Sequence, residues 1–166
     1  MTPLHAAPKP ASPRLGVGHV HLRVSDLERS IAFYSDVLGF DVIQRFASGA
    51  AFLSAGGYHH HLGLNTWESL GATPPPAGHT GLYHVAFLYP TRAELAQAVQ
   101  RVLDAGIALE GKADHGVSEA VYFTDPDRNG IELYWDRPRD AWPVDAAGKL
   151  QMGNDRLDLA DLLATG

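Results

Sequence analysis

An internal repeat is the feature of this sequence that most constrains its fold. The segment HVHLRV at residues 19–24 returns in altered form as HVAFLY at residues 84–89, a displacement of 65 residues. Apolar residues alternate along the first copy, as they do in a strand with one buried face. Two copies of one structural unit predict a domain built from two similar halves.

A helix is expected after each copy of this strand. Ser25 with Glu28 predicts a capping box at the start of the first helix, in which hydroxyl and carboxylate satisfy free backbone donors. Thr91 with Glu94 predicts the same cap for the second helix. Apolar residues then recur at helical spacing, as Leu27, Ile31, Tyr34 and Leu38 and as Leu95, Val99, Val102 and Leu103.

Short runs rich in β-branched and aromatic residues follow each helix and predict strands. These runs lie at about 40–46, 50–54 and 59–66, and at about 108–114, 119–124 and 130–136. We therefore predict an α+β fold of paired βαβββ repeats. The expected boundaries are a flexible extension at 1–15, one domain at 16–138 with repeats 16–67 and 81–138, and a tail with a short helix at 139–166.

Composition limits the chemistry and the partners of the chain. It contains 9 His, 19 acidic residues and no Cys, so a metal site must use imidazole and carboxylate ligands. A net charge of −6 without a basic stripe argues against a nucleic-acid partner. We find neither an apolar run of the ~20 residues that span a bilayer nor a signal peptide, and we expect a cytoplasmic protein with no membrane partner.

Strand alternation selects a candidate metal site. The apolar residues of each strand should face the helices, which places His19 and His21 on the opposite face. The same argument places His84 and Glu132 on that face in the second repeat. A pseudo-twofold arrangement of the repeats would then bring His19, His84 and Glu132 together. Two imidazoles and one carboxylate form the facial set of non-haem Fe(II) sites, with positions open for substrate and O₂.

The same segments carry a family resemblance. The runs GHVHLRVSDL at 18–27 and DPDRNGIEL at 125–133 resemble the vicinal oxygen chelate superfamily, which includes glyoxalase I, fosfomycin-resistance enzymes and extradiol ring-cleaving dioxygenases. This resemblance covers about residues 16–138. It implies paired βαβββ repeats that form a cupped mixed sheet with a metal between the repeats. The implied ligands are His19, His84 and Glu132.

Within the superfamily, two segments are most similar to the catechol 2,3-dioxygenase branch. The spacing from His115 through Tyr122 to Glu132 resembles the extradiol signature, which implies that His115 and Tyr122 contact the substrate. This sequence departs from the signature at two positions. It has Lys112 where the signature has Gly, and Arg128 where the signature has Gly or Pro.

The second segment, HHHLGL at 59–64, resembles the extradiol segment that carries an acid/base histidine. Matching Gly63 selects His60, whereas strand alternation selects His61, so both are candidates. Where glyoxalase I supplies a second Glu, this stretch has no carboxylate. The DPDRN run at 125–129 also fits a calcium-loop pattern, but the strands expected on both sides favour a tight turn.

These observations predict an oxidoreductase: an extradiol dioxygenase of aromatic compound catabolism that uses Fe(II), with Mn(II) or another divalent metal as alternatives. The expected partners are a small aromatic substrate and O₂. We also expect a homodimer, because exposed sheet edges invite pairing. Two other classes remain open: a metal-independent binding or resistance protein, and a glyoxalase-like or thiol-transferase-like metal enzyme. The chain resembles the first half of longer dioxygenase-like proteins that contain two domains of this paired-repeat kind.

Overall fold

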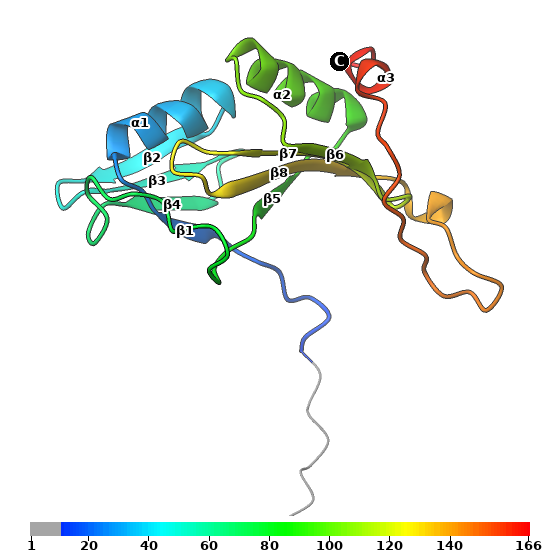
Figure 1. Cartoon of the computed structure of the whole chain (residues 1–166). Coiled ribbons are helices and arrows are strands. Elements are labelled where there is room, and N and C mark those ends of the chain that lie inside the picture. The colour runs from blue at the N-terminus through cyan, green and yellow to red at the C-terminus, as the bar shows by residue number, and fades with distance from the viewer. Residues whose placement is uncertain (1–10) are drawn as a thin grey trace, which may run out of the picture.

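Two similar modules, each with a mixed four-stranded sheet, make up the fold (Figure 1). The computed structural model describes residues 11–166. In each sheet the strands that come first and last in the chain lie side by side and run parallel, and the other neighbouring strands are antiparallel. The first sheet has the order β1-β4-β3-β2 and contains β1 (Val20–Arg23), β2 (Asp41–Phe46), β3 (Ala50–Ser54) and β4 (Leu62–Asn65). The second sheet has the order β5-β8-β7-β6 and contains β5 (Val85–Leu88), β6 (Gly111–Asp114), β7 (Ser118–Thr124) and β8 (Gly130–Asp136).

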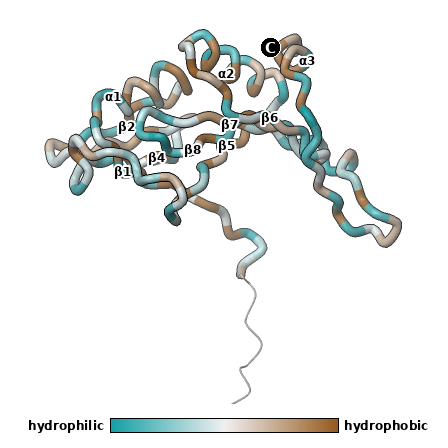
Figure 2. Tube along the Cα trace, in the orientation of Figure 1, coloured by the Kyte–Doolittle hydropathy of each residue, from teal (hydrophilic) through white to brown (hydrophobic). Residues whose placement is uncertain are grey.

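The helices lie on one side of the two sheets and leave the other side without a helix (Figure 1). Helix α1 (Leu27–Ala32) continues as a π-helical turn, η1 (Phe33–Val37), and α2 (Arg92–Asp104) follows β5. Figure 2 shows polar and apolar residues alternating around α2, as expected of a helix with one buried face. Side chains of both modules share a single hydrophobic core. The predicted α+β fold of two βαβββ modules is confirmed.

The predicted strands agree with the observed ones except for two that begin later than expected. The expected strands at 40–46, 50–54, 119–124 and 130–136 agree with the observed ones within one residue. The strand expected at 59–66 begins only at Leu62, because residues 55–61 form an irregular loop. The strand expected at 108–114 begins at Gly111.

The capping box predicted for the first helix is wrong. Asp26 caps α1 by accepting a hydrogen bond from the Arg29 backbone at 3.1 Å. The Ser25 hydroxyl is instead bonded to Asp127, from the other module. The second cap is confirmed for its hydroxyl: Thr91 accepts from the Glu94 backbone at 3.2 Å. The Glu94 carboxylate, expected to bind a backbone donor, instead accepts from the Thr91 hydroxyl at 2.6 Å.

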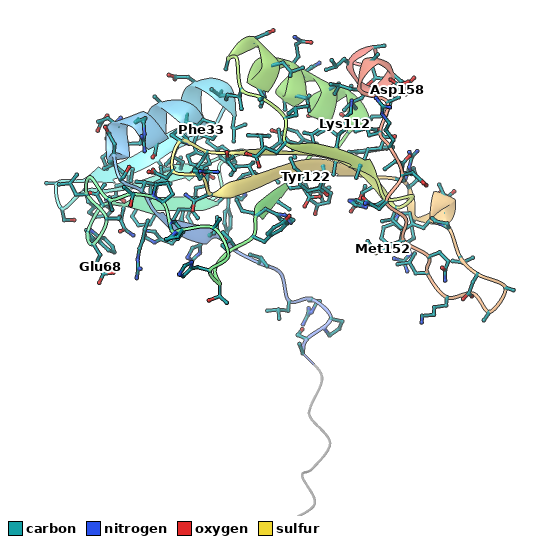
Figure 3. All side chains as sticks on the ribbon, in the orientation of Figure 1. Phe33, Glu68, Lys112, Tyr122, Met152 and Asp158 are labelled. Atoms are coloured by element: carbon teal, nitrogen blue, oxygen red, sulfur yellow. The ribbon has the colours of Figure 1, made fainter. Side chains whose placement is uncertain are left out.

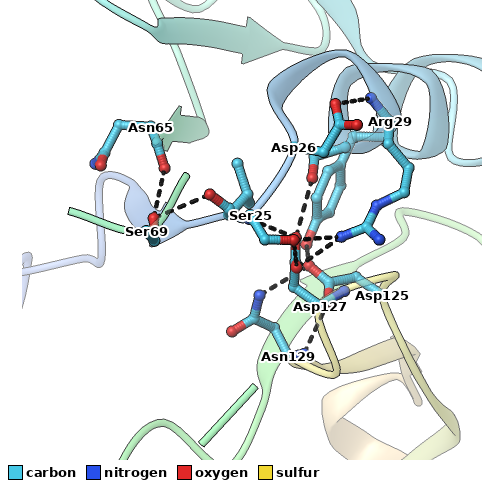
Figure 4. Close-up of polar contacts among 11 residues, drawn as sticks. Ser25, Asp26, Arg29, Asn65, Ser69, Asp125, Asp127 and Asn129 are labelled. Atoms are coloured by element: carbon cyan, nitrogen blue, oxygen red, sulfur yellow. Dashed lines mark hydrogen bonds and ion pairs between the residues drawn. The ribbon is translucent and has the colours of Figure 1, made fainter. Parts of the chain in front are cut away.

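A buried polar network joins the modules at the β7–β8 turn (Figure 4). Asp127, 8% exposed, accepts hydrogen bonds from the Ser25 backbone at 3.1 Å and the Arg29 guanidinium at 2.6 Å. Burial opposes ionisation of Asp127, but the hydrogen bonds from Ser25 and Arg29 outweigh it and lower the pKa of its carboxyl. Its neighbour Asp125 accepts from the Tyr34 hydroxyl of the first module at 2.9 Å. The turn between two strands is confirmed, in agreement with the argument against a calcium loop.

The C-terminal tail, residues 139–166, pairs with the edge of the second sheet. Asp155 forms an antiparallel bridge with Asp114 at the edge strand β6. After the short 3₁₀ turn η2 (Arg139–Ala141), the chain ends in α3 (Leu159–Leu163), which packs against α2. An ion pair between Arg92 and Asp161, 2.7 Å apart, supports this contact. Residues 1–10 of the predicted extension lie outside the described residues. Among residues 11–166, no helix combines the length and apolarity needed to cross a membrane.

Asp127→Asn should destabilise the protein by about 1–3 kcal/mol at pH 7, because a neutral amide replaces the carboxylate that pairs with the Arg29 guanidinium. Since the folded pKa of Asp127 lies below the unfolded value of about 3.9, its contribution is complete above that pH and is lost as the pH falls through the folded pKa. Urea unfolding at pH 7 and pH 3 should show the gap to wild type shrinking in acid. The control is Asp36→Asn, at an exposed carboxylate; an equal effect of both variants would contradict this role.

Candidate functional site

His84 and Glu132 meet near the start of β5 and β8, the parallel strand pair of the second sheet. Strands β5 and β8 run parallel, with Ala86 opposite Glu132, so His84 lies just before β5 and beside the start of β8. His84 Nε2 is 2.9 Å from Glu132 Oε2. The two side chains are 32% and 12% exposed. Two of the three predicted metal ligands are therefore in direct contact.

Gly130 makes this contact possible. A Cβ at residue 130 would lie 2.0 Å from the Tyr83 carbonyl oxygen and 3.0 Å from His84 Cβ. No side chain fits there unless the start of β5 moves. The sequence argument missed this residue, although a glycine two positions before the predicted ligand Glu132 was a usable signal of close backbone approach.

A hydrogen-bonded chain extends from Glu132 through both predicted substrate contacts. The Tyr122 hydroxyl donates to Glu132 Oε1 at 3.0 Å, and His115 Nε2 lies 2.9 Å from that hydroxyl. His115 Nδ1 donates to the Gly153 carbonyl at 2.9 Å, which fixes the ring. Burial first, and then the charge and hydrogen bond of Glu132, raise the pKa of Tyr122, so its proton is retained. Figure 3 shows Tyr122 on the sheet side away from the helices.

The structure distinguishes the two acid/base candidates by their surroundings. The His60 ring lies 4.4 Å from the His19 ring, measured between centroids, and so shares its surface. Partial burial and then the neighbouring His19 lower the pKa of His60, which favours the neutral form. His61 instead accepts a hydrogen bond from the Ala55 backbone at its Nδ1 and lies beside Phe40. The alternation argument for His61 assumed a regular strand, whereas both histidines precede β4.

His19 lies with the first module rather than beside His84. Within residues 11–166, no group of three His, Asp or Glu side chains is arranged to hold a metal ion. His21, the next residue on the same strand face, packs over Gly63 of β4, where a Cβ would lie 2.8 Å from the ring. Burial and the proximity of His19 lower the pKa of His21.

The His84 and Glu132 pair fits a divalent cation in two respects. Adjacent donors that each bind a metal at about 2.1 Å lie about 3 Å apart, close to the observed separation. His84 Nδ1, the other ring nitrogen, is buried without a hydrogen-bond partner among the described residues and takes no part in this pairing. An imidazole with a carboxylate is a donor set that suits Fe(II) and Mn(II). The described chain thus supplies two donors in contact, and the third predicted ligand, His19, stands apart from them.

An open cavity of about 420 Å³ lies next to this pair. His84 and Tyr122 line it, and both contact Glu132. Arg128 and Gly130, from the β7–β8 turn, form another part of the wall. Aromatic, histidine and carboxylate side chains around one cavity of this size can orient a small polar aromatic ligand.

The fold and this site define a two-module βαβββ protein in which a histidine and a glutamate, His84 and Glu132, are in contact beside an open cavity. The chain belongs to the glyoxalase/bleomycin resistance protein/dioxygenase superfamily, which it matches over residues 16–133. It is 43% identical over 147 residues to a catechol-2,3-dioxygenase of Bacillus subtilis (strain 168), covering 89% of this chain and 50% of that protein. It is 32% identical over 125 residues to biphenyl-2,3-diol 1,2-dioxygenase 3 of Rhodococcus globerulus, covering 75% of this chain and 64% of that protein.

A solved glyoxalase/dioxygenase from Nostoc punctiforme has the same fold, with a TM-score of 0.63 and 25% identity over 80% of this chain and all of that one. The chain spans about half to two thirds of the two dioxygenases that it matches. The predicted superfamily is therefore confirmed, and the activity of those longer proteins enters below as a proposal.

Gly130→Ala should destabilise the protein by about 1–3 kcal/mol, because the new methyl group must push Tyr83 and His84 away. We also expect weaker binding of a divalent metal, since the shift separates His84 from Glu132. Thermal unfolding and Mn(II) titration measure the two effects. Gly81→Ala is the matched control, because a Cβ at residue 81 has nothing within 4 Å. Similar behaviour of both variants would contradict the close-approach argument.

Proposed function

We propose that the chain is a metal-dependent extradiol dioxygenase that cleaves the ring of a catechol-type substrate with O₂. The observation that carries this proposal is the continuous contact chain from His84 through Glu132 and Tyr122 to His115. It joins two proposed metal ligands to two proposed substrate contacts, and one residue of each pair, His84 and Tyr122, lines the cavity. The 43% identity to a catechol-2,3-dioxygenase supports the same reaction class.

His84 and Glu132 would hold the metal, and we propose His19 as the third ligand. Fe(II) is the proposed metal, with Mn(II) or another divalent ion as alternatives. When bound, such a metal would chelate both substrate oxygens and carry electrons between the diol and O₂. The carboxylate of Glu132 keeps one oxygen toward His84 and the other toward Tyr122, so one residue orients both groups.

The remaining residues would handle protons and position the substrate. Tyr122 lines the cavity and keeps its proton, so its hydroxyl would turn from Glu132 to donate a hydrogen bond to a substrate oxygen. His115, whose Nε2 lies 2.9 Å from that hydroxyl, would hold it in position for the substrate.

Neutral His60, whose Nδ1 lies 2.8 Å from His59 Nδ1, could accept a proton from the diol at its other ring nitrogen, a role typically worth 10²–10⁴ in rate. We therefore propose His60 rather than His61 as the acid/base group, since the His60 ring lies beside the proposed ligand His19 whereas His61 lies beside Phe40.

His84→Ala should abolish stoichiometric iron binding and oxygen uptake with catechol while the far-UV circular dichroism stays unchanged. Protein purified and loaded with Fe(II) under anaerobic conditions should be compared with His79→Ala, in which an exposed loop histidine is removed. Unchanged oxygen uptake in His84→Ala would contradict the assignment. Absence of metal in the wild type would indicate a binding protein, and turnover without O₂ would indicate a thiol-transferase-like or isomerase-like enzyme.

We also propose that the chain forms a homodimer through a free sheet edge. Every residue of the edge strand β2 is exposed, and Ile43 is 50% and Phe46 43% exposed. Unpaired strand edges with apolar side chains favour association. Ile43→Lys should shift the protein from dimer to monomer in sedimentation equilibrium, whereas Leu70→Lys, at a residue 79% exposed outside the sheets, should not. A monomeric wild type would contradict this proposal.

A further inference from the structure

Arg128 occupies a backbone position that suits glycine. Its φ is +64°, and it is the one residue other than Gly with a positive φ among residues 11–166. Arginine gains nothing locally from this left-handed conformation, which is costly for a residue with a Cβ. The turn itself imposes the conformation, because the Asp125 side chain accepts from the Asp127 and Asn129 backbones on either side. The reason for an arginine must therefore lie in its side chain.

The Arg128 side chain lines the same cavity as His84 and Tyr122. It is exposed, and its guanidinium makes no ion pair or hydrogen bond with another residue in the described part of the chain. By contrast, Arg92 and Arg137 are both bonded to Glu119. The wall of this cavity thus contains a guanidinium whose donors are available to a ligand.

The charges around the cavity favour an anion at this point. Among the described lining residues, Arg128 is the only Lys or Arg and Glu110 the only acid. The Glu110 carboxylate accepts a hydrogen bond from the Thr124 hydroxyl at 3.0 Å, which occupies it in part. A guanidinium presents paired donors that match the two oxygens of a carboxylate.

We propose that Arg128 binds the carboxylate of an aromatic diol acid, and so selects dihydroxy aromatic carboxylates over uncharged catechols. This inference rests on the proposed function for the diol half of the ligand, and on Arg128 alone for the carboxylate half. A cavity of about 420 Å³ accommodates a single substituted ring. The diol would face His84 and Tyr122, and the carboxylate would extend toward the β7–β8 turn.

Calorimetric titration under anaerobic conditions tests the proposal with 3,4-dihydroxybenzoate, uncharged 4-methylcatechol, and benzoate as a probe without a diol. In Arg128→Gly, the dissociation constants of the two carboxylates should rise about 10- to 100-fold, and that of 4-methylcatechol should stay unchanged. Arg128→Lys should be intermediate, since it keeps the charge but loses the paired donors. Arg14→Gly, at an exposed arginine outside the cavity, should bind like the wild type.

If Arg128→Gly weakens the binding of all three ligands equally, or leaves the binding of both carboxylates unchanged, the proposed role of Arg128 is overturned. Glycine suits the backbone at residue 128, so the variant should unfold at a temperature no lower than the wild type. If 4-methylcatechol fails to bind the metal-loaded wild type, the proposed function is contradicted. Benzoate binding, measured with and without metal, still decides the role of Arg128 in that case.

Discussion

The hydrogen bonds that Asp127 accepts from the first module are the interaction on which the rest of the arrangement depends. Asp127 belongs to the second module, yet its carboxylate is held by Ser25 and Arg29 at the start of α1. Asp125, two residues earlier, is bonded to the Tyr34 hydroxyl in the same region. A buried carboxylate is costly unless it is paired and hydrogen-bonded, so the modules are held in the one relative position that satisfies both acids.

The same turn leads directly into the candidate site. Residues 125–132 contain, in order, the acids that dock on the first module, the left-handed Arg128, the close-approach Gly130 and the proposed ligand Glu132. Because these residues are consecutive, fixing the turn on α1 also fixes where β8 starts, and with it the separation of Glu132 from His84. Module docking and site geometry are therefore set by one short segment.

Sequence reasoning succeeded where the signal was periodic and local. Alternation along two strands was enough to place His84 and Glu132 on one face, and the repeat was enough to predict two matching modules. It failed where a residue distant in the sequence competes with the local backbone for a side chain's hydrogen bond. Ser25 has the sequence context of a helix cap, but Asp127 binds its hydroxyl and Asp26 takes the cap instead. The choice between His60 and His61 depended on where β4 begins, and alternation applies only inside a strand.

Divergence of the two repeats explains why, within residues 11–166, the contact of a histidine with a carboxylate at this position lies in the second module and not in the first. In the first, the strand-pair position that faces the open side is filled by His21 lying over Gly63; in the second, the equivalent position pairs Ala86 with Glu132. Large and small residues have exchanged places between the strands. A carboxylate at residue 63 would collide with the His21 ring, whereas Ala86 leaves the space that Glu132 needs to reach both His84 and Tyr122. A second carboxylate, which glyoxalase I would supply from this stretch as a fourth ligand, is thus excluded by packing as well as by the absence of a carboxylate in the sequence there.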